Sequence, residues 1–110
     1  MQTIDYKVDK DGVALVTVDV KDKPMNVITP EFMDDVFEVA EKIAADDKVK
    51  GAVVTSGKNS FMAGADLKEL VATFDQRTDA AEVYSWCRKL QQAYRALETC
   101  GKPVAVAVNG

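Results

Sequence analysis

Three short apolar runs, separated by two long amphipathic stretches, most constrain how this chain folds. The runs are VALVTVDV (13–20), KGAVVTSG (50–57) and PVAVAV (103–108). The stretches between them, 28–49 and 80–100, carry apolar residues at helical spacing. A further alternating segment, TIDYKV (3–8), precedes the first run and is joined to it by the turn sequence DKDG. Strand alternating with helix predicts an α/β fold with a mostly parallel sheet covered by helices.

Local signals define both long helices. Thr29 is the expected N-cap and Pro30 the first residue of the first helix. Asp79 with Glu82 fits an acidic capping box for the second, which Gly101 and Pro103 end. The first buried stripe is predicted to be Phe32, Met33, Val36, Phe37, Ala40, Ile43 and Ala44, and the second Val83, Trp86, Cys87, Leu90, Tyr94 and Leu97.

The final run, PVAVAV, is apolar on both faces and is typical of a buried central strand. Such strands feed a loop and a covering helix, and ligands bind beyond their carboxyl ends. We therefore expect residues 1–110 to be the N-terminal part of a larger domain, truncated at its C-terminal end.

Composition excludes several functions. The 110 residues carry a net charge of -4, which argues against a nucleic-acid partner, and include no histidine, the commonest general base and zinc ligand. No apolar run is long enough to span a membrane, and the N-terminus lacks the pattern of a signal peptide. The two cysteines, Cys87 and Cys100, are interpreted as reduced thiols, so we expect a cytoplasmic protein without a bound metal.

The stretch SFMAGADLKE (60–69) carries the candidate chemistry. Asp66 and Glu69 have capping-box spacing, which predicts a short helix over 67–74 and favours a capping role over an acid/base pair. Gly64 and Ala65 are small and lie just before that cap, where backbone N–H groups are unpaired. A free N–H at Ala65 would suit a carbonyl oxygen that becomes an oxyanion. A plain strand-to-helix turn without a ligand explains the same residues equally well.

The segment SGKNSFMAGADLKEL, with KPMNV before it and KPVAVAVNG after it, strongly resembles the crotonase (enoyl-CoA hydratase/isomerase) superfamily. The resemblance covers essentially the whole chain. Within the superfamily, DKPMN and SGKNSFMAGAD look most like the hydratase part of multifunctional fatty-acid-oxidation alpha subunits. The implied fold is a crotonase-like half-fold of ββα repeats.

The resemblance implies specific site residues. Ala65 would supply one backbone N–H of an oxyanion hole, with the second donor and the acid/base glutamates located after Gly110. Coenzyme A would lie against Met25, Asn26 and Val27 and against the backbone of the segment 63–67. Lysines flanking these loops would meet its phosphates. The matching positions are Lys23, Met25, Asn26, Val27, Ala63, Gly64, Ala65, Asp66, Leu67 and Lys68.

The implied reaction is hydration of a 2-enoyl-CoA thioester in fatty-acid β-oxidation, with this piece alone inactive. The resemblance also implies that the chain itself holds no cofactor. A longer protein would carry an NAD-dependent 3-hydroxyacyl-CoA dehydrogenase part after these residues, and would assemble as a homo-oligomer or with a thiolase subunit. The alternatives are an acyl-CoA isomerase or hydrolase, or a non-catalytic half-fold with an assembly role. An unrelated nucleotide-binding domain is disfavoured, because the chain lacks a phosphate-binding loop.

Overall fold

A four-stranded sheet and two helices make up the computed structural model, which describes residues 1–64 and 80–110. The elements in chain order are β1 (Ile4–Val8), β2 (Val13–Val18), α1 (Pro30–Ala45), β3 (Gly51–Ser56), α3 (Ala80–Glu98) and β4 (Val104–Val106). The sheet order is β1-β2-β3-β4, with β1 antiparallel to β2 and the other two pairs parallel. The predicted α/β class, a mostly parallel sheet covered by helices, is confirmed. The predicted helix over 67–74 and the Asp79 cap lie outside the described residues.

The turn between β1 and β2 follows from its sequence. The Asp9 side chain accepts hydrogen bonds from the N–H groups of Asp11 (2.8 Å) and Val13 (2.9 Å). Gly12 adopts a positive φ of 83°, which side chains disfavour, and a Cβ there would lie 2.6 Å from the Lys48 carbonyl oxygen. The turn therefore requires both the aspartate and the glycine, as DKDG predicts.

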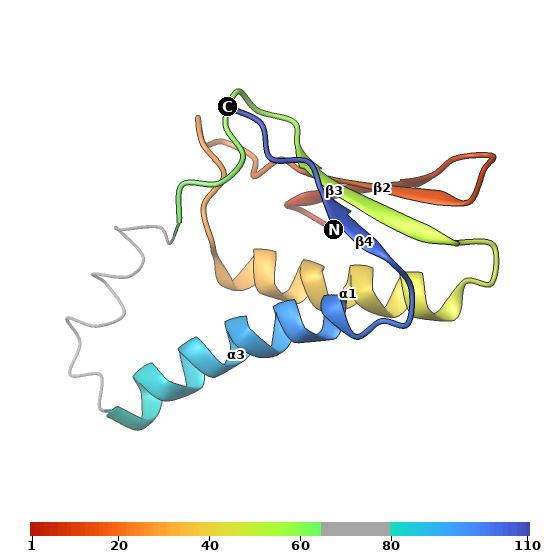
Figure 1. The fold of residues 1–110 in the computed structure, drawn as a ribbon. Coiled ribbons are helices and arrows are strands. Elements are labelled where there is room, and N and C mark those ends of the chain that lie inside the picture. The colour runs from red at the N-terminus through yellow and green to blue at the C-terminus, as the bar shows by residue number, and fades with distance from the viewer. Residues whose placement is uncertain (65–79) are drawn as a thin grey trace.

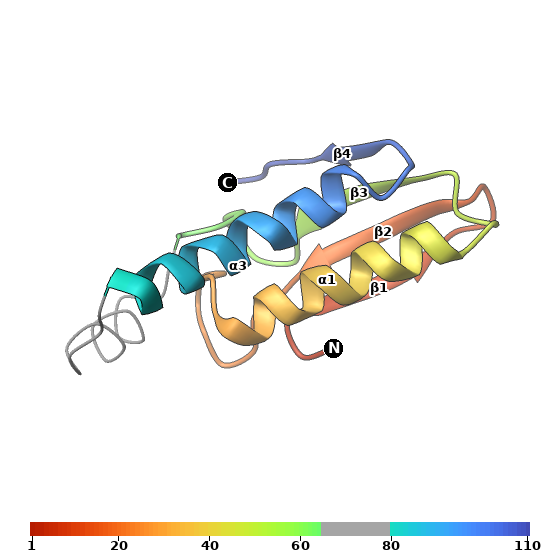
Figure 2. The same cartoon turned by 90° about the horizontal axis from the view of Figure 1, so that it is seen from below.

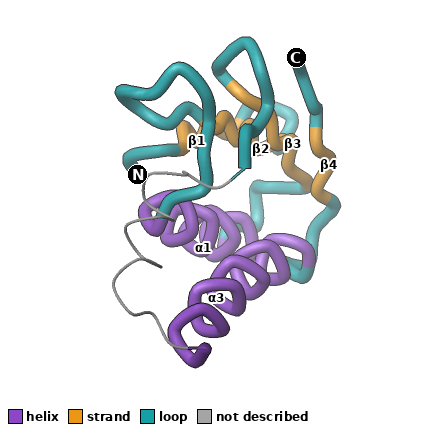
Figure 3. The backbone as a smooth tube through the Cα atoms, turned by 90° about the vertical axis from the view of Figure 1, so that its left-hand side faces the viewer, coloured by secondary structure: helices purple, strands orange, loops and turns teal. Residues whose placement is uncertain are grey.

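Both helices lie against the same face of the sheet, which gives two layers (Figure 2, Figure 3). Alternate residues of the strands point into this layer, and Val16, Val54 and Val106 lie in register across three of them. The hydrophobic core consists of buried residues from the first three strands, α1 and the connections around them, joined by Ala93 of α3. None of the helices in the described part of the chain has both the length and the hydropathy to cross a bilayer.

Helix α1 begins as predicted. The Thr29 hydroxyl accepts a hydrogen bond from the Phe32 N–H (3.1 Å), and Pro30 is the first helical residue. The buried stripe differs in detail from the predicted one. Val39 is buried although the predicted stripe omitted it, whereas Ala44 is exposed and Phe37 only partly buried. The stripe follows the curved contact with the sheet and α3, which helical spacing alone does not define.

The predicted apolar face of α3 is confirmed in part. Helix α3 contacts α1 and buries Ala93 completely, and Leu97 packs against the core. A small residue at the contact lets two helices approach closely. Cys87 is exposed, contrary to the prediction, and Tyr94 is 43% exposed. The Val83 side chain lies outside what the structure describes. Strand β4 is short and lies at the edge of the sheet formed by the described residues, with Val106 54% exposed.

Candidate functional site

The predicted site residues that the structure describes lie in two loops at one end of the sheet, where the parallel strands finish. The first loop, 19–28, follows β2, and the second, 57–64, follows β3. Because these strands are parallel, their carboxyl ends meet at the same edge, where ligands bind in such sheets. Figure 1 shows the C-terminus of the chain beside the second loop, so the segment after β4 reaches the same edge.

Two backbone hydrogen bonds join these loops. The Ala63 N–H donates to the Asn26 carbonyl (2.8 Å), and the Ile28 N–H donates to the Gly64 carbonyl (2.7 Å). Residues separated by more than thirty positions in the sequence thus lie side by side, which brings together the two segments that the resemblance assigned to coenzyme A. Since the Ala63 N–H is bonded within the fold, it is not a free donor for a ligand.

Asn26 is fully buried, with an exposed fraction of 0%. Its side-chain oxygen accepts from the Val20 N–H (3.0 Å). Its two amide hydrogens are shared among the Val18 carbonyl (3.0 Å), the Ser56 hydroxyl (2.8 Å) and the Phe61 carbonyl (3.0 Å). The side chain therefore holds the ends of β2 and β3 and the second loop together. A contact between Asn26 and coenzyme A stays a prediction, and its side-chain polar atoms already have partners within the protein.

The other predicted residues of the first loop are more accessible. Met25 is 46% exposed, and Val27 and Lys23 are partly buried. Lys23 lines a shallow hollow of about 440 Å³ together with Lys21, Asp22 and Glu31. Charges of both signs line this hollow, so its walls do not by themselves select an anion.

Gly64 ends the described part of the second loop in a left-handed conformation, with a φ of 87°. No atom of the described residues lies within 4 Å of the position that a Cβ would occupy there, so the backbone faces open space within the described part of the chain. This combination of conformation and openness is what a close approach of another molecule to the backbone requires. Ala65, Asp66, Leu67 and Lys68, including the predicted oxyanion donor, lie outside the described residues.

Sequence reasoning missed two residues that organise this edge. The Lys58 ammonium lies 2.8 Å from an Asp19 carboxylate oxygen and donates to the Lys23 carbonyl (2.8 Å). The Asn109 side chain donates to the Lys58 carbonyl (2.8 Å) and so ties the segment after β4 to the second loop. No local sequence signal distinguishes a lysine of this kind from a solvated loop lysine, because its partners are distant in the chain.

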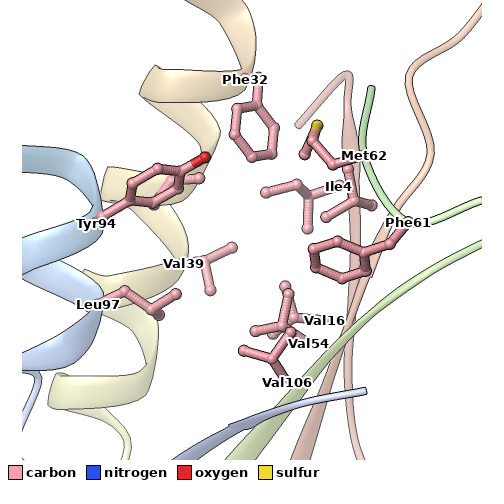
Figure 4. Close-up of a pocket in the computed structure, with 12 residues that line it drawn as sticks. Ile4, Val16, Phe32, Val39, Val54, Phe61, Met62, Tyr94, Leu97 and Val106 are labelled. Carbon is pink, nitrogen blue, oxygen red and sulfur yellow. The ribbon is translucent and has the colours of Figure 1, made fainter. Parts of the chain in front are cut away.

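An apolar cavity of about 190 Å³ lies between the sheet and the helices (Figure 4). Phe61 and Met62 line it from the second loop, Tyr94 and Leu97 from α3, and Val106 from β4. Its lining suits a hydrocarbon but supplies no carboxylate or cation for catalysis. Within the described residues there is also no cluster of three side chains able to hold a metal ion.

Comparisons with known proteins agree on one family. The family model "Enoyl-CoA hydratase/isomerase" matches residues 9–110. The fatty acid oxidation complex subunit alpha of Idiomarina loihiensis is 37% identical over 105 residues, which is 94% of this chain and 14% of that protein. The corresponding subunit of Shewanella halifaxensis is also 37% identical over 105 residues. The chain thus spans about a seventh of the length of these relatives.

Solved structures show the same fold. An enoyl-CoA hydratase from Shewanella pealeana superposes with a TM-score of 0.87 at 18% identity, covering 98% of this chain and 39% of that one. A probable enoyl-CoA hydratase from Mycobacterium smegmatis gives a TM-score of 0.83 at 25% identity, with 100% and 42% coverage. The family match over residues 9–110, together with this shared fold, means that the chain belongs to the enoyl-CoA hydratase/isomerase family.

Proposed function

We propose that this chain forms the acyl-CoA-binding N-terminal part of an enoyl-CoA hydratase. The observation that carries the proposal is the pairing of residues 26–28 with residues 63–64 at the carboxyl edge of the sheet. These two loops contain the segments that the resemblance to the crotonase superfamily assigned to coenzyme A. The exposed Met25 side chain and the open backbone at Gly64 support access for a ligand.

In the proposed mechanism, the Ala65 N–H donates a hydrogen bond to the thioester oxygen. Water addition to a 2-enoyl thioester moves negative charge onto that oxygen as an enolate forms. A fixed backbone donor stabilises this charge more than the neutral carbonyl, and one such donor contributes about 3–4 kcal/mol in a closed site. Ala65 follows Gly64, whose left-handed conformation leaves its own backbone open among the described residues.

The proposed contacts with coenzyme A divide between the two loops. Met25 and Val27 would pack against it from the first loop, while the backbone at Gly64 and the segment 65–67 would approach it from the second. Lys23 and Lys68 would meet its phosphates, since an acidic chain needs local positive charge to bind a polyanion. Asn26 would act here through its buried side chain, which holds both loops in place.

We further propose a role in fatty-acid β-oxidation, because the relatives are alpha subunits of fatty acid oxidation complexes. On this proposal, the longer protein carries an NAD-dependent 3-hydroxyacyl-CoA dehydrogenase part, assembles with a thiolase subunit or with copies of itself, and acts in the cytoplasm. The second oxyanion donor and the acid/base glutamates would lie after Gly110. Hydration requires a base to activate water and an acid to protonate carbon, so residues 1–110 alone are expected to be inactive.

Calorimetric titration with butyryl-CoA, a saturated thioester that cannot be hydrated, tests the binding site. Ala65→Pro removes the backbone N–H, whereas the matched control Ala65→Ser keeps it. We expect Ala65→Pro to weaken binding and Ala65→Ser to bind like the wild type, with circular dichroism verifying that both fold. Equal affinity of a folded Ala65→Pro variant would exclude a hydrogen bond from this N–H to the neutral thioester, and an unchanged kcat in the full-length enzyme would exclude it as the oxyanion donor.

Turnover separates the hydratase proposal from its alternatives. Residues 1–110 should consume no crotonyl-CoA. In the full-length enzyme, Ala65→Pro should lower kcat strongly while Ala65→Ser has little effect. A full-length protein that binds butyryl-CoA but does not hydrate crotonyl-CoA would be an isomerase, a hydrolase or a binding module instead.

A further inference from the structure

Lys58 extends from the second loop into the first. Its side chain is only 13% exposed, although lysine is normally solvated. The ammonium lies 2.8 Å from the Asp19 carboxylate and 2.8 Å from the Lys23 carbonyl, so both contacts are made to loop 19–28. A lysine with so little contact with water needs such partners, because an unpaired buried charge is costly.

The main chain of Lys58 is held as well. Its N–H donates to the Ser56 hydroxyl (2.9 Å), and its carbonyl accepts from the Asn109 side chain (2.8 Å). One residue thus connects the end of β3, the first loop and the segment after β4. Its side chain forms a tie between the loops that is separate from the Asn26 network.

Comparison with a second ion pair, Lys89–Asp34, shows how the environment of Lys58 differs. Lys89 and Asp34 also approach to 2.8 Å, but they join the two helices, and the Lys89 side chain is 42% exposed. Exposed pairs of that kind contribute little to stability. The Lys58 pair has the same separation, and its Asp19 side chain is itself 54% exposed, but the Lys58 side chain is only 13% exposed and its ammonium also donates to a backbone carbonyl.

We propose that Lys58 is a positioning residue that fixes the two loops relative to each other. In this role it acts through its contacts with Asp19 and Lys23, and so through the loops that carry Met25 and Gly64. Its effect on ligand affinity rests on the proposed acyl-CoA function, whereas its effect on loop geometry does not. A preorganised site binds its ligand more tightly, because less conformational entropy is lost when the ligand binds.

Amide hydrogen exchange tests the loop geometry directly. The Ala63 and Ile28 N–H groups report on loop pairing, and the Ala52 N–H, bonded to the Pro103 carbonyl (2.9 Å), reports on the core. Lys58→Met should accelerate exchange at the two loop amides by about tenfold or more while the core amide stays unchanged. Lys89→Met, the matched control, should change none of the three. Unchanged loop amides in Lys58→Met, or equal acceleration at the core amide, would overturn the proposal.

Titration with butyryl-CoA tests the consequence for the ligand. We expect Lys58→Met to bind about tenfold more weakly than the wild type, with Lys58→Arg restoring much of the loss because it keeps the charge. If the wild type binds but Lys58→Met binds equally well, the positioning role is refuted. If the wild type itself does not bind, the acyl-CoA proposal fails, and the exchange result alone decides whether Lys58 holds the loops.

Discussion

Replacing Asn26 by alanine tests whether one buried amide holds the candidate site together. The side chain makes hydrogen bonds to the ends of β2 and β3 and to the second loop. The Asn26→Ala substitution removes all of them and leaves a small void, because the position is completely buried.

The loss of stability in Asn26→Ala depends on which partners of the amide are left without any hydrogen bond. The Val18 carbonyl still accepts from the Gly57 N–H (3.0 Å), and the Ser56 hydroxyl still donates to the Ser60 carbonyl (2.7 Å). The described structure gives the Val20 N–H and the Phe61 carbonyl no other partner. Each unsatisfied buried group costs about 1–3 kcal/mol, so we expect a loss of about 3–5 kcal/mol including the void.

Urea unfolding followed by circular dichroism measures this loss. A natural domain is stable by only about 5–15 kcal/mol, so the midpoint should fall by a large fraction. Asn59→Ala is the control, because Asn59 lies three residues beyond β3 and is exposed. It should change the free energy of unfolding by less than about 0.5 kcal/mol. A loss below about 1 kcal/mol for Asn26→Ala, with an unchanged urea dependence, would refute the idea that this amide organises the loops.

Three further substitutions test other parts of the fold. Lys102→Met should destabilise the chain to urea by about 1–3 kcal/mol, because the ammonium donates to the Ile43 and Asp46 carbonyls at the end of α1. Tyr6→Phe should leave stability at pH 7 equal or up to about 1 kcal/mol higher, since the buried hydroxyl has no partner among the described residues. Burial, and to a lesser extent the charge of Asp46, raise the pKa of Tyr6 in the folded protein. The unfolded chain therefore loses this proton more readily, and the stability of the wild type should decline as the pH rises above about 10. Unfolding midpoints measured against pH should show a smaller decline for Tyr6→Phe. Val39→Ile should raise the melting temperature, because it adds one methylene to the 190 Å³ apolar cavity, worth up to about 0.8 kcal/mol; a lower melting temperature would mean that the cavity cannot accept it.

Local interactions account for what could be predicted about the fold. The Thr29 cap, the proline after it and the turn around Asp9 and Gly12 depend on neighbours within four residues, and all appear as expected. The burial of Ala93 was missed, because it depends on how helix α3 meets the rest of the fold. Helical spacing indicates which face of a helix is apolar, but packing against the neighbouring elements determines which residues of that face are fully buried.

The candidate site also combines features that could be predicted from the sequence with features that only the structure shows. The resemblance to the family indicated two segments, Met25 to Val27 and Ala63 to Leu67, and the structure pairs residues 26–28 with residues 63 and 64, the described part of the second. The sequence did not indicate that the Asn26 side chain is occupied within the protein or that Lys58 spans the loops. These facts depend on partners about thirty or more positions away.

The sequence by itself determined the order of the described strands and helices and the Thr29 cap, because short-range hydrogen bonding and periodic hydrophobicity depend on residues close together in the chain. Its motifs, by their resemblance, also indicated the family. Only the tertiary structure decided which polar side chains hold the edge of the sheet, since a buried asparagine or lysine is tolerated only where distant segments supply its hydrogen-bond partners.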